Sequence, residues 1–77
     1  MMSDDMHVVR SMEEIFPVLR FFTYEHLSPH LRTVSQPICV LAHEVAAKYA
    51  EGADERETAK ALDRLLEAKD AAVRAVV

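Results

Sequence analysis

A lysine interrupts an apolar stripe near the end of the chain. The apolar residues on its helical face are Leu62, Leu66, Val73 and Val76. An ammonium in such a stripe must reach solvent or neutralise something buried. Two explanations stay open: Lys69 contacts a carboxylate such as Asp70 of a neighbouring subunit, or it binds an anionic ligand.

Arg74 follows Lys69 on the same predicted helix, and Asp70 stands four residues before Arg74. At this spacing Asp70 can orient the guanidinium towards a ligand, or it can simply stabilise the helix. We treat Lys69, Asp70 and Arg74 as candidate ligand-binding residues.

Three further candidates precede or begin the first long helix. His30 and Arg32 fall in its first turns, where backbone donors and the helix dipole favour an anion, although solvated surface positions explain them too. Tyr24, with Phe21 and Phe22, could stack on a flat ring or could cap the helices without any ligand.

The histidines and the cysteine do not form a metal motif. A structural zinc site needs about four converging ligands, and the chain has no CxxC or HExxH sequence. Cys39 suits a small packed hydrophobic position better than a ligand role. We expect no metal and no cofactor.

Catalytic machinery is also missing from the sequence. Cys39 and His43 share a predicted helix face, but no oxyanion donor or third orienting group accompanies them. The chain has no GxGxxG and no P-loop, and its carboxylate pairs resemble solvated helix surface. We expect the protein not to be an enzyme.

The strongest structural signal is a helix over residues 54–77. This stretch has no Gly or Pro and consists largely of good helix formers. Asp54 is a suitable N-cap, and Glu57 stands where a capping box needs it.

A second helix is predicted over residues 28–51. Ser28 is a candidate N-cap, Pro29 suits the first helical position, and Gly52 supplies the stop. Its apolar residues recur at helical spacing through Pro37, which predicts one kinked helix. They are Leu31, Val34, Ile38, Leu41, Val45 and Tyr49.

Residues 11–27 form a lead-in to the two helices. Ser11 and Glu14 predict a capping box and a short helix that breaks near Pro17. The stretch Val18–Tyr24 favours strand and is too short for its period to decide, and we interpret it as extended. Residues 1–10 are predicted to be a flexible arm.

These elements predict an all-α fold: one domain over residues 11–77, built as an antiparallel helical hairpin. A 77-residue chain is marginal as a monomer. Apolar residues also fall on more faces than two helices can cover. We therefore expect the hairpins to assemble into an oligomeric helix bundle.

Charge and composition limit the partners. The net charge of −4 disfavours duplex nucleic acid and anionic membranes. A single cysteine suits a reducing compartment, the N-terminus lacks the pattern of a signal peptide, and no apolar run nears the roughly 18 residues of a membrane span. We expect a soluble intracellular protein.

The stretches FFTYEHLSPHLRTVSQP and ERETAKALDRLLEAKDAAVRAVV resemble small phage-encoded helical-hairpin proteins of the anti-defence "sponge" group. Those proteins sequester the cyclic nucleotide signals of bacterial CBASS and Thoeris defence. The resemblance covers residues 21–77 and implies a homodimer or hexamer with pockets between subunits. It implies ligand-binding roles for Tyr24, Lys69, Asp70 and Arg74, and a location in the cytoplasm of the infected host cell.

Two functions follow as hypotheses. The first is a non-enzymatic oligomer that sequesters a cyclic di- or trinucleotide signal. The alternative is a helical protein-binding module that inhibits or scaffolds a host protein through an apolar helix face.

Overall fold

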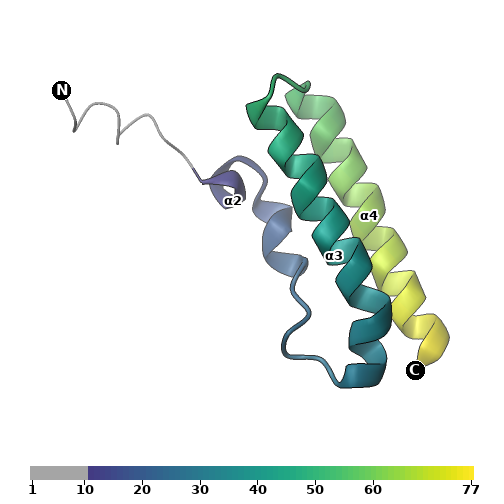
Figure 1. The fold of residues 1–77 in the computed structure, drawn as a ribbon. Helices are drawn as coiled ribbons and strands as arrows, with labels where there is room; N and C mark the ends of the chain where they lie inside the picture. The colour runs from purple at the N-terminus through teal and green to yellow at the C-terminus, as the bar shows by residue number, and fades with distance from the viewer. Residues whose placement is uncertain (1–10) are drawn as a thin grey trace.

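The computed structural model describes residues 11–77, so the predicted flexible arm at residues 1–10 lies outside the described residues. Two long helices, α3 (Pro29–Ala50) and α4 (Glu55–Val76), run antiparallel, side by side over their whole length (Figure 1). A short helix α2 (Met12–Ile15) and a 3₁₀ helix η1 (Pro17–Phe21) precede them. The predicted all-α class and the hairpin of two packed helices are confirmed.

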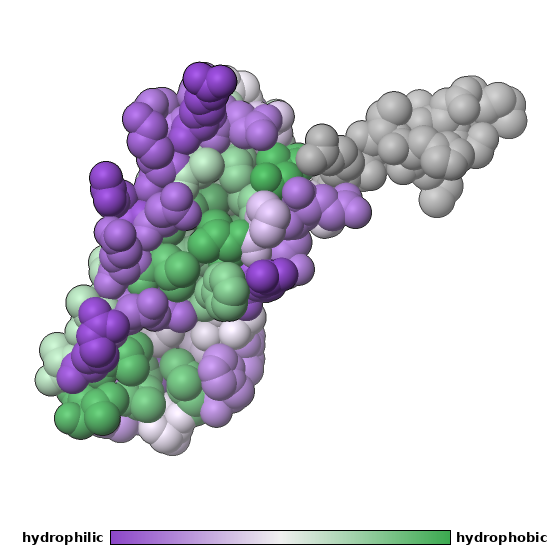
Figure 2. All heavy atoms as spheres, turned by 180° about the vertical axis from the view of Figure 1, so that it is seen from behind, coloured by the Kyte–Doolittle hydropathy of each residue, from purple (hydrophilic) through white to green (hydrophobic). Residues whose placement is uncertain are grey.

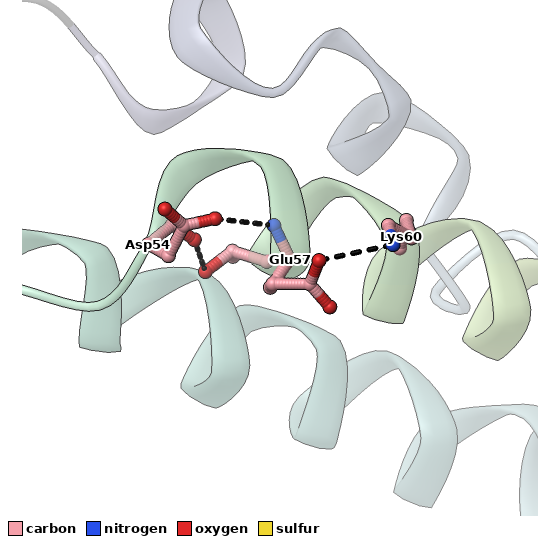
Figure 3. Close-up of polar contacts among 4 residues, drawn as sticks. Asp54, Glu57 and Lys60 are labelled. Atoms are coloured by element: carbon pink, nitrogen blue, oxygen red, sulfur yellow. Dashed lines mark hydrogen bonds and ion pairs between the residues drawn. The ribbon is translucent and has the colours of Figure 1, made fainter.

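Helix α4 begins at the predicted cap. The carboxylate of Asp54 accepts a hydrogen bond of 2.9 Å from the backbone N–H of Glu57, and the Glu57 side chain pairs with Lys60 at 2.9 Å (Figure 3). The Thr58 hydroxyl donates to the backbone carbonyl of Asp54 at 2.7 Å. The Asp54 side chain thereby satisfies one of the backbone N–H groups that have no partner within the helix at its start.

Helix α3 is continuous through Pro37, which confirms a single helix. Ser28 occupies the N-cap position, but its side chain makes no capping hydrogen bond, and Pro29 at the first position is the stronger signal. After the helix, Gly52 has a φ of 108°, which a side-chain-bearing residue rarely adopts. Glycine is therefore required at this turn.

The conformation of the lead-in differs from the prediction in one respect. Helix α2 and its Ser11–Glu14 capping box form as expected, but Val18–Phe21 is part of η1 and is not extended. A 3₁₀ helix has three residues per turn, so residues three apart lie on one face. Phe16, Leu19 and Phe22 have this spacing and are all buried. Pro17 fixes a φ suited to the first helical turn.

The core lies where the lead-in covers the hairpin. Phe16, Leu19 and Phe22 cluster with three small residues of α3 and one leucine of α4: Cys39, Ala42, Ala46 and Leu62. The larger residues of the predicted α3 stripe are only half-buried, and Leu41 is 46% exposed. Small residues occupy the centre because α3 is packed on two sides, by α4 and by the lead-in.

Some apolar surface stays open in a single copy. Phe21 is 48% exposed and Val40 is 42% exposed. Hydrophobic residues gather in the middle of the surface seen in Figure 2, beside the hydrophilic margin along one edge. Within residues 11–77, no helix is long and apolar enough to cross a membrane.

Candidate functional site

A hollow of about 250 Å³ lies where the lead-in meets the start of α3 and the last turns of α4. We call it the basic hollow. Its lining residues are Thr23, His26, Leu27, Ser35, Lys69, Asp70, Val73 and Arg74. The structure thus brings together the three candidates that the sequence placed at the end of α4.

Lys69 is held firmly at the basic hollow. Its ammonium donates a hydrogen bond of 2.7 Å to the carbonyl oxygen of Phe21 and lies 5.9 Å from the centre of the Phe22 ring. Its side chain is only 14% exposed, and Asp70 of the same chain lies 3.6 Å away. A lysine ammonium has three N–H donors, so donors remain for a ligand after the Phe21 carbonyl has taken one.

The charges at the basic hollow favour an anion. Lys69 and Arg74 are cationic, Asp70 is the one carboxylate in the lining, and the His26 ring contributes nitrogens that can donate or accept a hydrogen bond. Thr23 adds an exposed hydroxyl group that can donate to oxygen, whereas the Ser35 hydroxyl is fully buried and pairs with the Cys39 sulfur at 3.5 Å. This combination of two cations and a hydroxyl donor is suited to a phosphate group.

Tyr24 lines a second, larger hollow of about 490 Å³. We call it the aromatic hollow. Its lining residues are Phe22, Thr23, Tyr24, Glu25, Val40, His43, Glu44 and Ala47. Thr23 lines both hollows, so the lead-in chain forms the wall between them. On the side facing α3, a His43 ring nitrogen bonds to the carbonyl of Phe22 at 3.3 Å.

His30 and Arg32 line neither hollow. The guanidinium of Arg32 donates to the backbone carbonyls of Glu25 and Leu27, at 3.1 and 3.0 Å. A His30 ring nitrogen bonds to the carbonyl of Val76 at 3.2 Å. Both side chains therefore tie together parts of the fold, and the backbone carbonyls take the place that an anion was expected to occupy.

Glu25 has a perturbed acidity at the edge of the aromatic hollow. The pKa of its carboxyl lies below the ordinary 4.5, because the backbone N–H groups of Glu25 and Tyr24 donate to the carboxylate. The positive charges of Arg32 and His26 lower the pKa further. The carboxylate thus stays ionised into mildly acidic solution.

Sequence reasoning missed His26, Thr23 and Ser35 as lining residues. His26 lies two residues before the Ser28 cap and belongs to no motif, and the two hydroxyl residues have no distinctive spacing. The structure adds them because the lead-in folds back over α3 and α4. In residues 11–77, no three His, Cys, Asp or Glu side chains are grouped so that they could hold a metal ion.

No protein-family model, curated protein or solved structure matches this chain. The resemblance to the anti-defence hairpin proteins therefore stays a prediction from the sequence.

Proposed function

We propose that this chain is a non-enzymatic, oligomeric helical protein that binds and sequesters a cyclic nucleotide signal. In the setting that the resemblance implies, this binding antagonises bacterial anti-phage defence. The observation that carries the proposal is the convergence of Lys69, Arg74 and His26 on one hollow. The phosphates of a cyclic nucleotide are the anionic groups that such a site would hold.

The size of the basic hollow supports an assembly with shared pockets. At about 250 Å³ it lies below the ~300–1,000 Å³ that is usual for ligand pockets. It has room for one phosphate and its neighbouring atoms, so the remainder of a cyclic di- or trinucleotide would extend beyond it. A second copy would have to cover that remainder. The open apolar surface at Phe21, Val40 and Leu41 also favours assembly.

Charge favours a small anion over a polymer. The chain carries a net charge of −4, and its described cations at the site are few. Affinity for polymeric nucleic acid depends on many phosphate contacts. Two or three phosphates of a small cyclic molecule require only a few well-placed donors.

Calorimetry and thermal unfolding against a panel of cyclic di- and trinucleotides test the proposal. We expect one member to bind, to raise the melting temperature, and to return intact when the protein is denatured. A nucleotide returned cleaved would mean an enzyme. If no member binds and a specific host protein is bound directly instead, the alternative function as a protein-binding module is favoured.

Variants at the basic hollow sharpen the experiment. Lys69→Met and Arg74→Gln should each weaken nucleotide binding at least tenfold. Lys60→Met is the matched control, because Lys60 lies on the exposed side of α4 in a pair with Glu57. Arg74→Gln leaves the Lys69–Phe21 hydrogen bond in place. A loss of nucleotide affinity in this variant therefore reflects a lost contact with the ligand and not a loosened lead-in. Unchanged binding in both variants would refute the site.

A further inference from the structure

One side of the hairpin has no covering element among residues 11–77. The lead-in packs on the side that contains Cys39, Ala42 and Ala46. At about 100° per residue, four apolar residues of α3 and four of α4 fall on the flanks turned away from it. We call this set the open face: Val34, Ile38, Leu41, Val45, Ala61, Leu65, Ala68 and Ala72. Leu41 and Ala68 are exposed and the other six are half-buried, with Ile38, Val45 and Leu65 packed in part against the core.

The two helices are held in register at both ends. His30 bonds to the carbonyl of Val76 at one end, and the Tyr49 hydroxyl donates to Glu55 at 3.0 Å at the other. This register fixes which residues of the open face lie level across the hairpin. The level pairs are Val34 with Ala72, Ile38 with Ala68, Leu41 with Leu65, and Val45 with Ala61.

The open face therefore consists of two parallel strips of side chains, one on α3 and one on α4. Its α3 half carries branched side chains at all four levels, and its α4 half carries alanine at three of them. Branched side chains pack well against small ones, since the small residues leave space for them. A partner surface that sets alanines against the α3 half and branched side chains against the α4 half would fit this face along its length.

We propose that a second copy of this chain covers the open face, related by a two-fold axis parallel to the helices. This axis places α3 of each copy on α4 of the other, so that Val34 meets Ala72 of the partner subunit. The result is a four-helix bundle with both lead-ins on the outside. A two-fold axis across the helices would instead set branched residues against branched residues and alanine against alanine.

Charges at the edge of the open face favour the same arrangement. Lys48 lies level with Glu57, and Glu44 lies within one turn of the level of Arg64. The proposed axis brings each of these residues near the opposite charge of the partner. Within one chain, Lys48 pairs with Glu51 at 3.5 Å and Glu57 pairs with Lys60 at 2.9 Å, and these side chains are about two-thirds exposed. Such exposed pairs are weak, so they can rearrange across an interface.

This interface does not use the basic hollow, which lies on the lead-in side. It can therefore be tested without any nucleotide, and its failure is distinguishable from failure of the proposed function. It leaves the two basic hollows of a dimer on opposite outer surfaces. A pocket shared between subunits then needs a second kind of contact, which a hexamer would contain.

Oxidative cross-linking of the nucleotide-free full chain tests the geometry. All chains carry Cys39→Ala, which removes the buried thiol. A mixture of Val34→Cys and Ala72→Cys chains should give a disulfide-linked heterodimer, because the two positions come within disulfide range. Cross-linking of Val34→Cys with Val45→Cys chains instead would place α3 on α3 and overturn the proposal.

Sedimentation equilibrium with charge variants gives a second test. Lys48→Glu and Glu57→Lys should each self-associate several-fold more weakly, because like charges then face each other. Their mixture should regain the affinity of the native chain, because every pair is again of opposite sign. A mixture no tighter than either variant alone would overturn the arrangement.

A third test compares two neighbouring exposed residues. Leu41→Asp should dissociate the dimer, whereas Val40→Asp should not, since Val40 lies outside the open face and lines the aromatic hollow. Both side chains are over 40% exposed, so neither change should unfold a single copy. A native chain that is monomeric at micromolar concentration, or equal dissociation by both variants, would refute the interface.

Discussion

The Lys69 ammonium is bonded to the carbonyl oxygen of Phe21, a residue 48 positions earlier in the chain. One cation of the basic hollow therefore also fastens the lead-in to α4. The same side chain thus contributes both to the candidate site and to the fold around it.

Replacing Lys69 should loosen the lead-in as well as weaken ligand binding. We expect Lys69→Met to lower the free energy of unfolding by about 1.5–3 kcal/mol, the range for a hydrogen bond from a charged donor. Hydrogen exchange should quicken at the amides of η1 and Phe22, because their segment is released. Lys60→Met should change neither quantity. If the lead-in amides of Lys69→Met exchange as slowly as those of the native chain, the Lys69–Phe21 hydrogen bond does not hold the lead-in in place.

Arg32 is predicted to be a structural residue. Arg32→Gln should lose both hydrogen bonds to the backbone carbonyls of Glu25 and Leu27 and destabilise the chain by about 2 kcal/mol or more. Urea unfolding at one fixed protein concentration measures this, since assembly makes stability depend on concentration. Arg56→Gln, on the exposed surface of α4, is the matched control. Equal midpoints for the two variants would show that the Arg32 bonds contribute nothing.

The two helix starts should respond differently to loss of their cap side chains. Asp54→Ala should cost about 1 kcal/mol, because it removes the acceptor of the Glu57 N–H. Ser28→Ala should cost much less, because the Ser28 side chain makes no capping bond. Thermal or urea unfolding of the two variants side by side provides the comparison. A larger loss of stability for Ser28→Ala than for Asp54→Ala would contradict the conclusion that only Asp54 caps its helix with its side chain.

Glu25 should titrate below its ordinary pKa. We expect the carboxyl signal of Glu25, followed by NMR, to have its midpoint below 4.5. Because the folded pKa is the lower one, the stabilisation by this carboxylate is present above pH 4.5 and is lost as the pH falls through the folded pKa. In Glu25→Gln that part of the acid dependence should disappear. A midpoint at or above 4.5 would contradict the backbone hydrogen bonds to the carboxylate.

The two long helices could be predicted because their ends carry strong local signals. Asp54, Pro29 and Gly52 each act through the nearest few residues, so no knowledge of the packing is needed. The lead-in was harder. Its strand-favouring residues suggested an extended chain, whereas burial of Phe16 and Leu19 at 3₁₀ spacing decides its conformation. The signal for a 3₁₀ helix in the sequence was the spacing of three between Phe16, Leu19 and Phe22, next to Pro17.

The candidate site could be predicted only in part. Lys69 was recognisable because it interrupts an apolar stripe, and the sequence left open whether a carboxylate of a neighbouring subunit or an anionic ligand neutralises it. Neither explanation included the backbone carbonyl of Phe21, to which its ammonium donates. A pattern of side chains in the sequence cannot predict a hydrogen bond to a backbone carbonyl so distant along the chain. For the same reason His30 and Arg32 were interpreted as ligand-binding residues, although each bonds to a carbonyl.

The segment Phe21–Leu27 is tied to the two long helices by Lys69, His43 and Arg32, and each of these ties ends on a main-chain oxygen of the segment. A main-chain oxygen is present whatever amino acid occupies the position. An exposed side chain such as that of Thr23 can thus be replaced while these hydrogen bonds persist. Related chains could in this way acquire different ligand preferences on one unchanged scaffold.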